Sequence, residues 1–144
     1  MIHPPRNRSV RALLFILALP LAHAGEAVVK WPSLKKLDDL AEKCEALSEK
    51  KDVAALRKIA TSVKAAAEAV ESEGVPKNAK EPEQVKVFQG DLKSLTDSIT
   101  DPEKQDGEEL CALLAGVHPL VEQLMETSGM PHVHETEEKG NQPK

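Results

Sequence analysis

Apolar residues recur at helical spacing in four stretches of the chain. In the first stretch Leu34, Leu37, Ala41 and Cys44 follow one another at intervals of three and four residues, which places them on one face of a helix. The same spacing returns three more times, and the alternation of apolar and polar residues that is typical of strands is not evident. The pattern predicts an all-α fold, with helices over residues 33–50, 52–74, 82–99 and from 102 or 107 to 128.

The ends of these stretches carry signals for starting and stopping a helix. Ser33 and Asp52 can cap the first turn of a helix, and Pro82 fits a first turn because its missing N–H is not needed there. Gly74 and Gly129 supply the left-handed residue that commonly ends a helix. Four helices joined by short loops predict an antiparallel up-down-up-down four-helix bundle.

Two residues interrupt the predicted helices. Gly90, inside the third helix, costs about 1 kcal/mol relative to alanine and is expected to allow close approach of a neighbouring helix. Pro119, inside the fourth helix, removes the amide that would bond the carbonyl of Ala115. We therefore expect a kink in the fourth helix.

Residues 1–24 have the three parts of a secretory signal peptide. Three arginines, Arg6, Arg8 and Arg11, precede an apolar run, and Ala22 and Ala24 provide the small residues that signal peptidase requires. The apolar run of about 11 residues is too short for a bilayer, which needs roughly 20. The prediction is cleavage before Gly25, export to the periplasm or beyond the cell, a helical bundle over residues 25–129 and a polar, histidine-containing tail over residues 130–144.

The charge of the chain excludes two classes of function. The chain has 19 Lys and Arg against 24 Asp and Glu, a formal net charge of −5, and loss of the signal peptide makes the remainder more acidic. A nucleic-acid binder needs clustered cations to neutralise phosphates, and a membrane-surface helix is usually basic. We expect neither a nucleic-acid partner nor a membrane span after cleavage.

The two cysteines fall at matching levels of the predicted bundle. Cys44 lies about five residues before the end of the first helix, and Cys111 lies about five residues after Gly107, near the start of the fourth. In an oxidising compartment a disulfide between adjacent antiparallel helices is expected, with a stabilisation of about 4 kcal/mol. Two buried free thiols, or a pair of thiolate ligands for a soft metal, are the alternatives.

Histidine and methionine are concentrated in one part of the mature chain. His118 and Met125 share a face of the fourth helix, and the tail contains Met130, His132 and His134. Imidazole is the commonest metal-ligating side chain, and thioether with imidazole suits copper, with methionine favouring Cu(I). The sequence thus indicates cofactor binding by His118 and Met125 and metal binding by Met130, His132 and His134.

The expected geometry separates these residues into two groups. Ten residues of helix, or about 15 Å of rise, lie between His118 and Ser128. His118 is therefore not expected to share a metal with His132 unless the tail folds back. The alternative interpretations are a histidine with a satisfied hydrogen bond at position 118 and a solvated tail.

Sequence motifs that are typical of enzymes are not evident in this chain. The sequence contains no Gly-rich phosphate loop, HExxH, CxxC or CxxCH, and it lacks the paired Glu-x-x-His of a di-iron bundle. We expect a protein that is not an enzyme.

The segment Glu81-Pro82-Glu83-Gln84-Val85-Lys86-Val87-Phe88 follows a proline-containing loop and opens the third helix. Together with the signal peptide and the four helix lengths, it resembles the family of soluble cytochrome b562 over about residues 33–128. The resemblance implies a periplasmic four-helix bundle that binds haem b between a methionine of the first helix and a histidine of the fourth. Here the first helix has Leu34 and Leu37 and no methionine, and His118 lies two turns before Met125.

The expected function is therefore an exported helical bundle that binds a metal centre, either haem or a copper ion, for electron transfer or metal handling. A redox or envelope protein is the expected partner. The competing expectation is a non-catalytic structural or protein-interaction module of the cell envelope.

Overall fold

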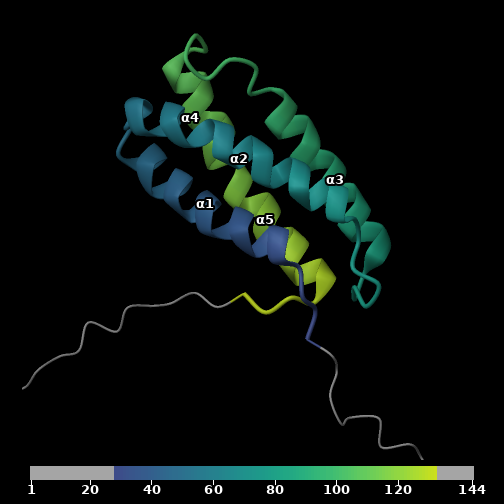
Figure 1. Cartoon of the computed structure of the whole chain (residues 1–144). Coiled ribbons are helices and arrows are strands. Elements are labelled where there is room, and N and C mark those ends of the chain that lie inside the picture. Colours follow the sequence, from purple (N-terminus) through teal and green to yellow (C-terminus); the bar gives the residue numbers. More distant parts are fainter. Residues whose placement is uncertain (1–27, 133–144) are drawn as a thin grey trace, which may run out of the picture.

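The computed structural model describes residues 28–132, and every regular element in that range is a helix (Figure 1). The predicted signal peptide and the tail from residue 133, which includes His134, lie outside the described residues. The helices are α1 (Pro32–Glu49), α2 (Val53–Glu73), α3 (Pro82–Asp97), α4 (Gly107–Ala115) and α5 (Val117–Ser128). The all-α prediction is confirmed, and α4 and α5 together make up the predicted fourth helix.

Most of the predicted helix ends are confirmed. Asp52 caps α2 by accepting a hydrogen bond from the amide of Ala55, at 3.1 Å. Gly74 and Gly129 end α2 and α5 with φ of 74° and 80°, the left-handed region that favours glycine. The prediction of a Ser33 cap is wrong, because α1 begins at Pro32 and Ser33 instead hydrogen bonds to the carboxylate of Glu73.

The fourth helix is interrupted at Gly116, as the proline signal predicted. Pro119 has no N–H to donate to the carbonyl of Ala115, so one rung of the helical ladder is missing and α4 ends there. Gly116 also faces the side chain of Leu95, which would lie 3.4 Å from a Cβ at this position. The interruption lies two residues before His118.

Helices α1 and α2 run in opposite directions, and so do α3 and α5. Ser33 and Glu73 join the start of α1 to the end of α2. The amides of Lys80 and Glu81, just before α3, donate to the carbonyls of Ser128 and Thr127 at the end of α5, at 3.1 and 2.8 Å. Helix α1 packs against α2, α4 and α5, and α3 packs against α2 and α5 (Figure 1).

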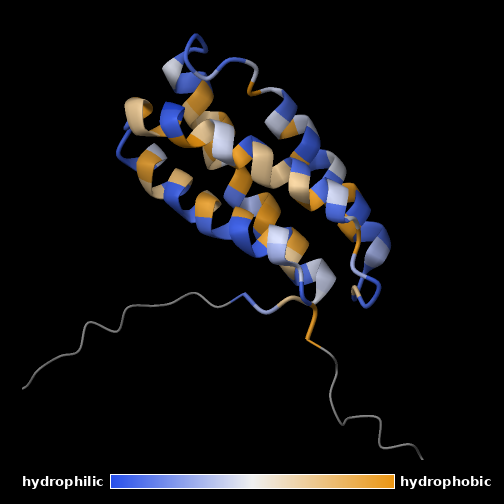
Figure 2. Ribbon diagram, in the orientation of Figure 1, coloured by the Kyte–Doolittle hydropathy of each residue, from blue (hydrophilic) through white to orange (hydrophobic). Residues whose placement is uncertain are grey.

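The interior is aliphatic, with a single indole. Apolar and polar residues alternate around each helix, so that each helix has one hydrophobic face (Figure 2). Among the described residues no helix is long and apolar enough to cross a membrane. The largest fully buried side chains are Trp31, Leu34, Leu37, Leu56, Val63, Val70, Leu92, Ile99, Leu110, Leu114, Leu124 and Met125.

Gly90 does not serve close helix approach, contrary to the sequence-based expectation. It is exposed on α3, and a Cβ built there has no neighbour within 4 Å. Replacing Gly90 with alanine is therefore expected to stabilise the protein by up to about 1 kcal/mol. Urea unfolding of the two proteins measures the difference.

Gly129 provides the matched control for that measurement. Its φ of 80° is costly for any residue with a Cβ, so Gly129→Ala is expected to destabilise the protein by about 1–2 kcal/mol. Equal effects of the two substitutions would contradict the conformational argument.

Candidate metal site

Asp38 is an acidic residue on the apolar face of α1. It lies four residues after Leu34 and three before Ala41, so the helical period turns it toward the interior. Its side chain is only 3% exposed, with Oδ1 3.3 Å from Nε2 of His132 and Oδ2 3.7 Å from Nζ of Lys35. A buried carboxylate needs such partners, because an isolated charge in the interior is strongly unfavourable.

Glu42 follows Asp38 by one helical turn. Residues four apart on a helix lie on the same side, so the two carboxylates of α1 extend toward the same region. Glu42 is exposed, whereas Asp38 is buried. The carboxylate of Asp38 is therefore enclosed by the protein, whereas that of Glu42 is in contact with solvent.

His118 enters the same region from α5. It lies two residues after the break at Gly116, and its side chain is 9% exposed. Its Nδ1 lies 2.5 Å from Oε2 of Glu45, and its Nε2 lies 3.8 Å from Oε1 of Glu122. The sequence-based interpretation of a histidine with a hydrogen-bonding partner is confirmed, although the partner is a carboxylate of α1.

His132 reaches the site because the chain turns back after α5. Gly129 adopts the left-handed conformation, and the amide of Met130 donates to the carbonyl of Met125 at 2.9 Å. The ring of His132 then lies 6.2 Å from the ring of His118, with 55° between the two planes. Residues 130–132, the described part of the predicted tail, thus bring His132 beside His118, which is the condition for the two histidines to share a metal.

Four side chains that can ligate a metal lie close together. One ligand atom from each of Asp38, Glu42, His118 and His132 lies within 4.8 Å of the others. Around a tetrahedral zinc ion with bonds of about 2.1 Å, donor atoms are roughly 3.4 Å apart. The four donor atoms, which lie within 4.8 Å of one another, are therefore spaced more widely than in a formed tetrahedral zinc site.

The two predicted methionine ligands belong to the apolar core or pack against it. Met125 is 1% exposed within the apolar core, seven residues or about 10.5 Å of helix beyond His118. Met130 is half-buried and packs against that core, beside Trp31. The side chains that the structure gathers around His118 and His132 are carboxylates, which sequence analysis did not select.

The predicted disulfide is not present. Both cysteines are free thiols. Cys44 is fully buried in the core, whereas Sγ of Cys111 lies 3.5 Å from the carbonyl oxygen of Ser48. Cys111 is thus level with Ser48, one turn or about 6 Å beyond Cys44 along α1. The alternative of two buried free thiols is confirmed for Cys44, whereas Cys111 is a free thiol that is only half-buried.

Burial raises the pKa of the Cys44 thiol from 9.0 to about 11. Because the thiolate is the reactive form, Cys44 is expected to resist iodoacetamide at pH 8 in the folded protein, while half-buried Cys111 reacts. Raising the pH toward 11 should increase the rate of alkylation of Cys44 about tenfold per pH unit. Mass spectrometry of the alkylated peptides measures both sites, and equal modification at pH 8 would contradict the burial argument.

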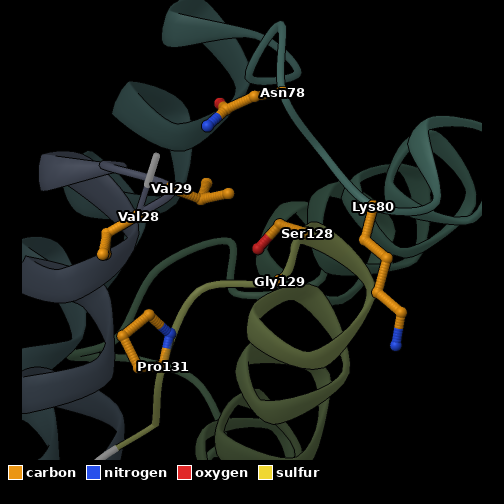
Figure 3. Close-up of a pocket in the computed structure, with 7 residues that line it drawn as sticks. All are labelled: Val28, Val29, Asn78, Lys80, Ser128, Gly129 and Pro131. Carbon is orange, nitrogen blue, oxygen red and sulfur yellow. The ribbon is translucent and has the colours of Figure 1, made fainter. Parts of the chain in front are cut away.

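An open groove of about 680 Å³ lies beside the segment that carries His132. It is bordered by the residues that lead into α1, by the loop between α2 and α3 and by the end of α5 (Figure 3). Pro131, the neighbour of His132, lines this groove together with Gly129 and Ser128. The same short segment therefore contributes to the groove and to the four-residue cluster.

Comparison with protein-family models, with curated proteins and with solved structures finds no match to this chain.

Proposed function

We propose that this chain is an exported helical bundle that binds one divalent transition-metal ion through Asp38, Glu42, His118 and His132. The convergence of two imidazoles and two carboxylates from α1, α5 and the segment after α5 is the observation that carries the proposal. Exposed carboxylates often cluster without binding a metal. Here Asp38 and His118 are both buried, and buried charged groups are usually paired or bound to a metal.

The donor set favours Zn²⁺ or Cu²⁺. Imidazole nitrogen and carboxylate oxygen are ligands of zinc, and nitrogen with oxygen also suits Cu²⁺. The two carboxylates balance the charge of a divalent ion when both histidines are neutral. Cu(I), which a thioether site such as Met130 would favour, is a weaker candidate than the sequence alone indicated.

Haem bound through His118 and Met125 is the competing cofactor. Both residues lie on α5, and Met125 belongs to the apolar core. Nδ1 of His118 is held by Glu45 from α1, so the ring stands beside the carboxylates of that helix. These contacts favour a bare ion over a porphyrin, and they support metal handling more directly than electron transfer.

Four protein ligands make a closed site, which suits storage, transfer or structural use of an ion better than catalysis. A catalytic zinc keeps an open position for water or substrate. The antiparallel up-down-up-down arrangement of four helices, with α4 and α5 as one broken helix, fits this role because bundles commonly hold metals between facing helices. The proposal includes export by the signal peptide and no enzymatic activity.

Titration of the purified metal-free chain tests the proposed function. Isothermal titration calorimetry with Zn²⁺ and with Cu²⁺ is expected to give one site with a Kd below about 1 µM, or −8 kcal/mol. Addition of haem is expected to give no Soret shift. A Kd weaker than about 1 µM for both metal ions would overturn the proposal. A shifted Soret band that depends on His118 would favour the haem alternative.

The groove of Figure 3 supports the second candidate, an interaction module of the envelope. Val28, at the rim of this groove, is 63% exposed. An envelope or redox protein would be the partner in that case.

A further inference from the structure

Glu45 lies outside the converging cluster but contacts one of its members. It follows Glu42 by three residues on α1 and its side chain is 51% exposed. Its Oε2 lies 2.5 Å from Nδ1 of His118, which is hydrogen-bonding distance. This hydrogen bond therefore joins α1 to α5 at one of the proposed ligands, His118.

The chemistry of this contact determines which nitrogen of His118 can bind a metal. An ionised carboxylate only accepts hydrogen bonds, so Nδ1 of His118 has to carry the proton that it donates to Glu45. The lone pair of the neutral ring is then on Nε2, on the opposite side of the ring. Oε1 of Glu122 is 3.8 Å from this Nε2.

We propose that Glu45 is a positioning residue of the metal site. It fixes the tautomer and the orientation of His118, so that Nε2 presents its lone pair toward Asp38, Glu42 and His132. This inference rests on the proposed function, since it deepens the same site. Carboxylates that hold a ligating histidine in this way typically contribute 10- to 100-fold to metal affinity.

The substitution Glu45→Gln tests the role, and Glu49→Gln is its matched control. Glu49 lies one turn further along α1 and is also exposed. Glutamine keeps the size of the side chain but offers both a donor and an acceptor, so it no longer selects one tautomer. Glu45→Gln is expected to raise the Kd for Zn²⁺ by 10- to 100-fold, whereas Glu49→Gln is expected to change it by less than twofold.

The tautomer of His118 can be measured in the absence of metal. Long-range ¹H–¹⁵N NMR of the metal-free protein is expected to show His118 with its proton on Nδ1, and to show a mixture of tautomers in Glu45→Gln. Circular dichroism checks that both variants fold.

Two results would overturn the positioning role. One is an Nε2–H tautomer of His118 in the unsubstituted, metal-free chain. The other is an affinity loss in Glu45→Gln with no change of tautomer, which would make Glu45 a direct ligand. Failure of the proposed function has a different signature, because the unsubstituted chain would then show the Nδ1–H tautomer and bind no Zn²⁺.

Discussion

Replacing Asp38 with asparagine is expected to weaken Zn²⁺ binding by about 1000-fold, or about 4 kcal/mol. The amide preserves the shape of the side chain and can still bond to His132, but it removes a negative charge from the site. Because the Asp38 side chain is only 3% exposed, its attraction for a cation is little screened by solvent and salt. Isothermal titration calorimetry of the two metal-free proteins measures the loss.

Asp39 is the matched control, since it is the same residue type one position further along α1. Its side chain is 57% exposed and its Oδ1 lies 2.6 Å from Nζ of Lys35. Lys35 and Asp39 are both exposed and lie four residues apart, so this pair is an ordinary surface contact. Its hydrogen bond raises the pKa of Lys35. Asp39→Asn is expected to change the Kd for Zn²⁺ by less than twofold. Similar losses in both variants would show that general negative charge, rather than the site, attracts the ion.

The helices were predictable because their signals are local. Apolar spacing depends only on the helical period, and Asp52, Gly74 and Gly129 act on backbone groups within a few residues of themselves. The interruption at Gly116 was also predictable, since the missing N–H of Pro119 has the same consequence in any helix. The two cysteines were harder to place, because a shift of one turn between packed helices cannot be read from the lengths of the loops.

The sequence predicted the two histidines of the candidate site but neither its carboxylates nor the fact that the histidines lie together. His118 and His132 were selected by residue type, but the direction of the chain after Gly129 depends on contacts made in three dimensions. The hydrogen bonds from Lys80 and Glu81 to the end of α5 fix that end, and the turn then leads to α1. Asp38 and Glu42 were missed because acidic residues are common on helices. The available signal was the position of Asp38 within the apolar stripe between Leu34 and Ala41.

Substitutions at the adjacent residues Leu37 and Asp38 are expected to show that stability and metal binding depend on different side chains. Leu37 is fully buried in the core. Leu37→Ala removes buried methyl groups and leaves a cavity, so it is expected to lower the free energy of unfolding of the metal-free protein by about 3 kcal/mol. For a domain of this size, that is a large part of the total stability of about 5–15 kcal/mol. Urea unfolding followed by the fluorescence of buried Trp31, the only tryptophan, measures the change.

Zinc should stabilise the unsubstituted protein and Leu37→Ala equally. At a free concentration 100 times the Kd, an ion that binds only the folded state adds about 2.7 kcal/mol to the free energy of unfolding. Leu37→Ala retains the four ligands and should show this gain in full, whereas Asp38→Asn should lose most of it at the same zinc concentration. If Leu37→Ala does not fold, Leu37→Met conserves the volume and is expected to cost less than about 1.5 kcal/mol. A zinc gain that disappears in a folded Leu37 variant would mean that the site depends on core packing as well as on its ligands.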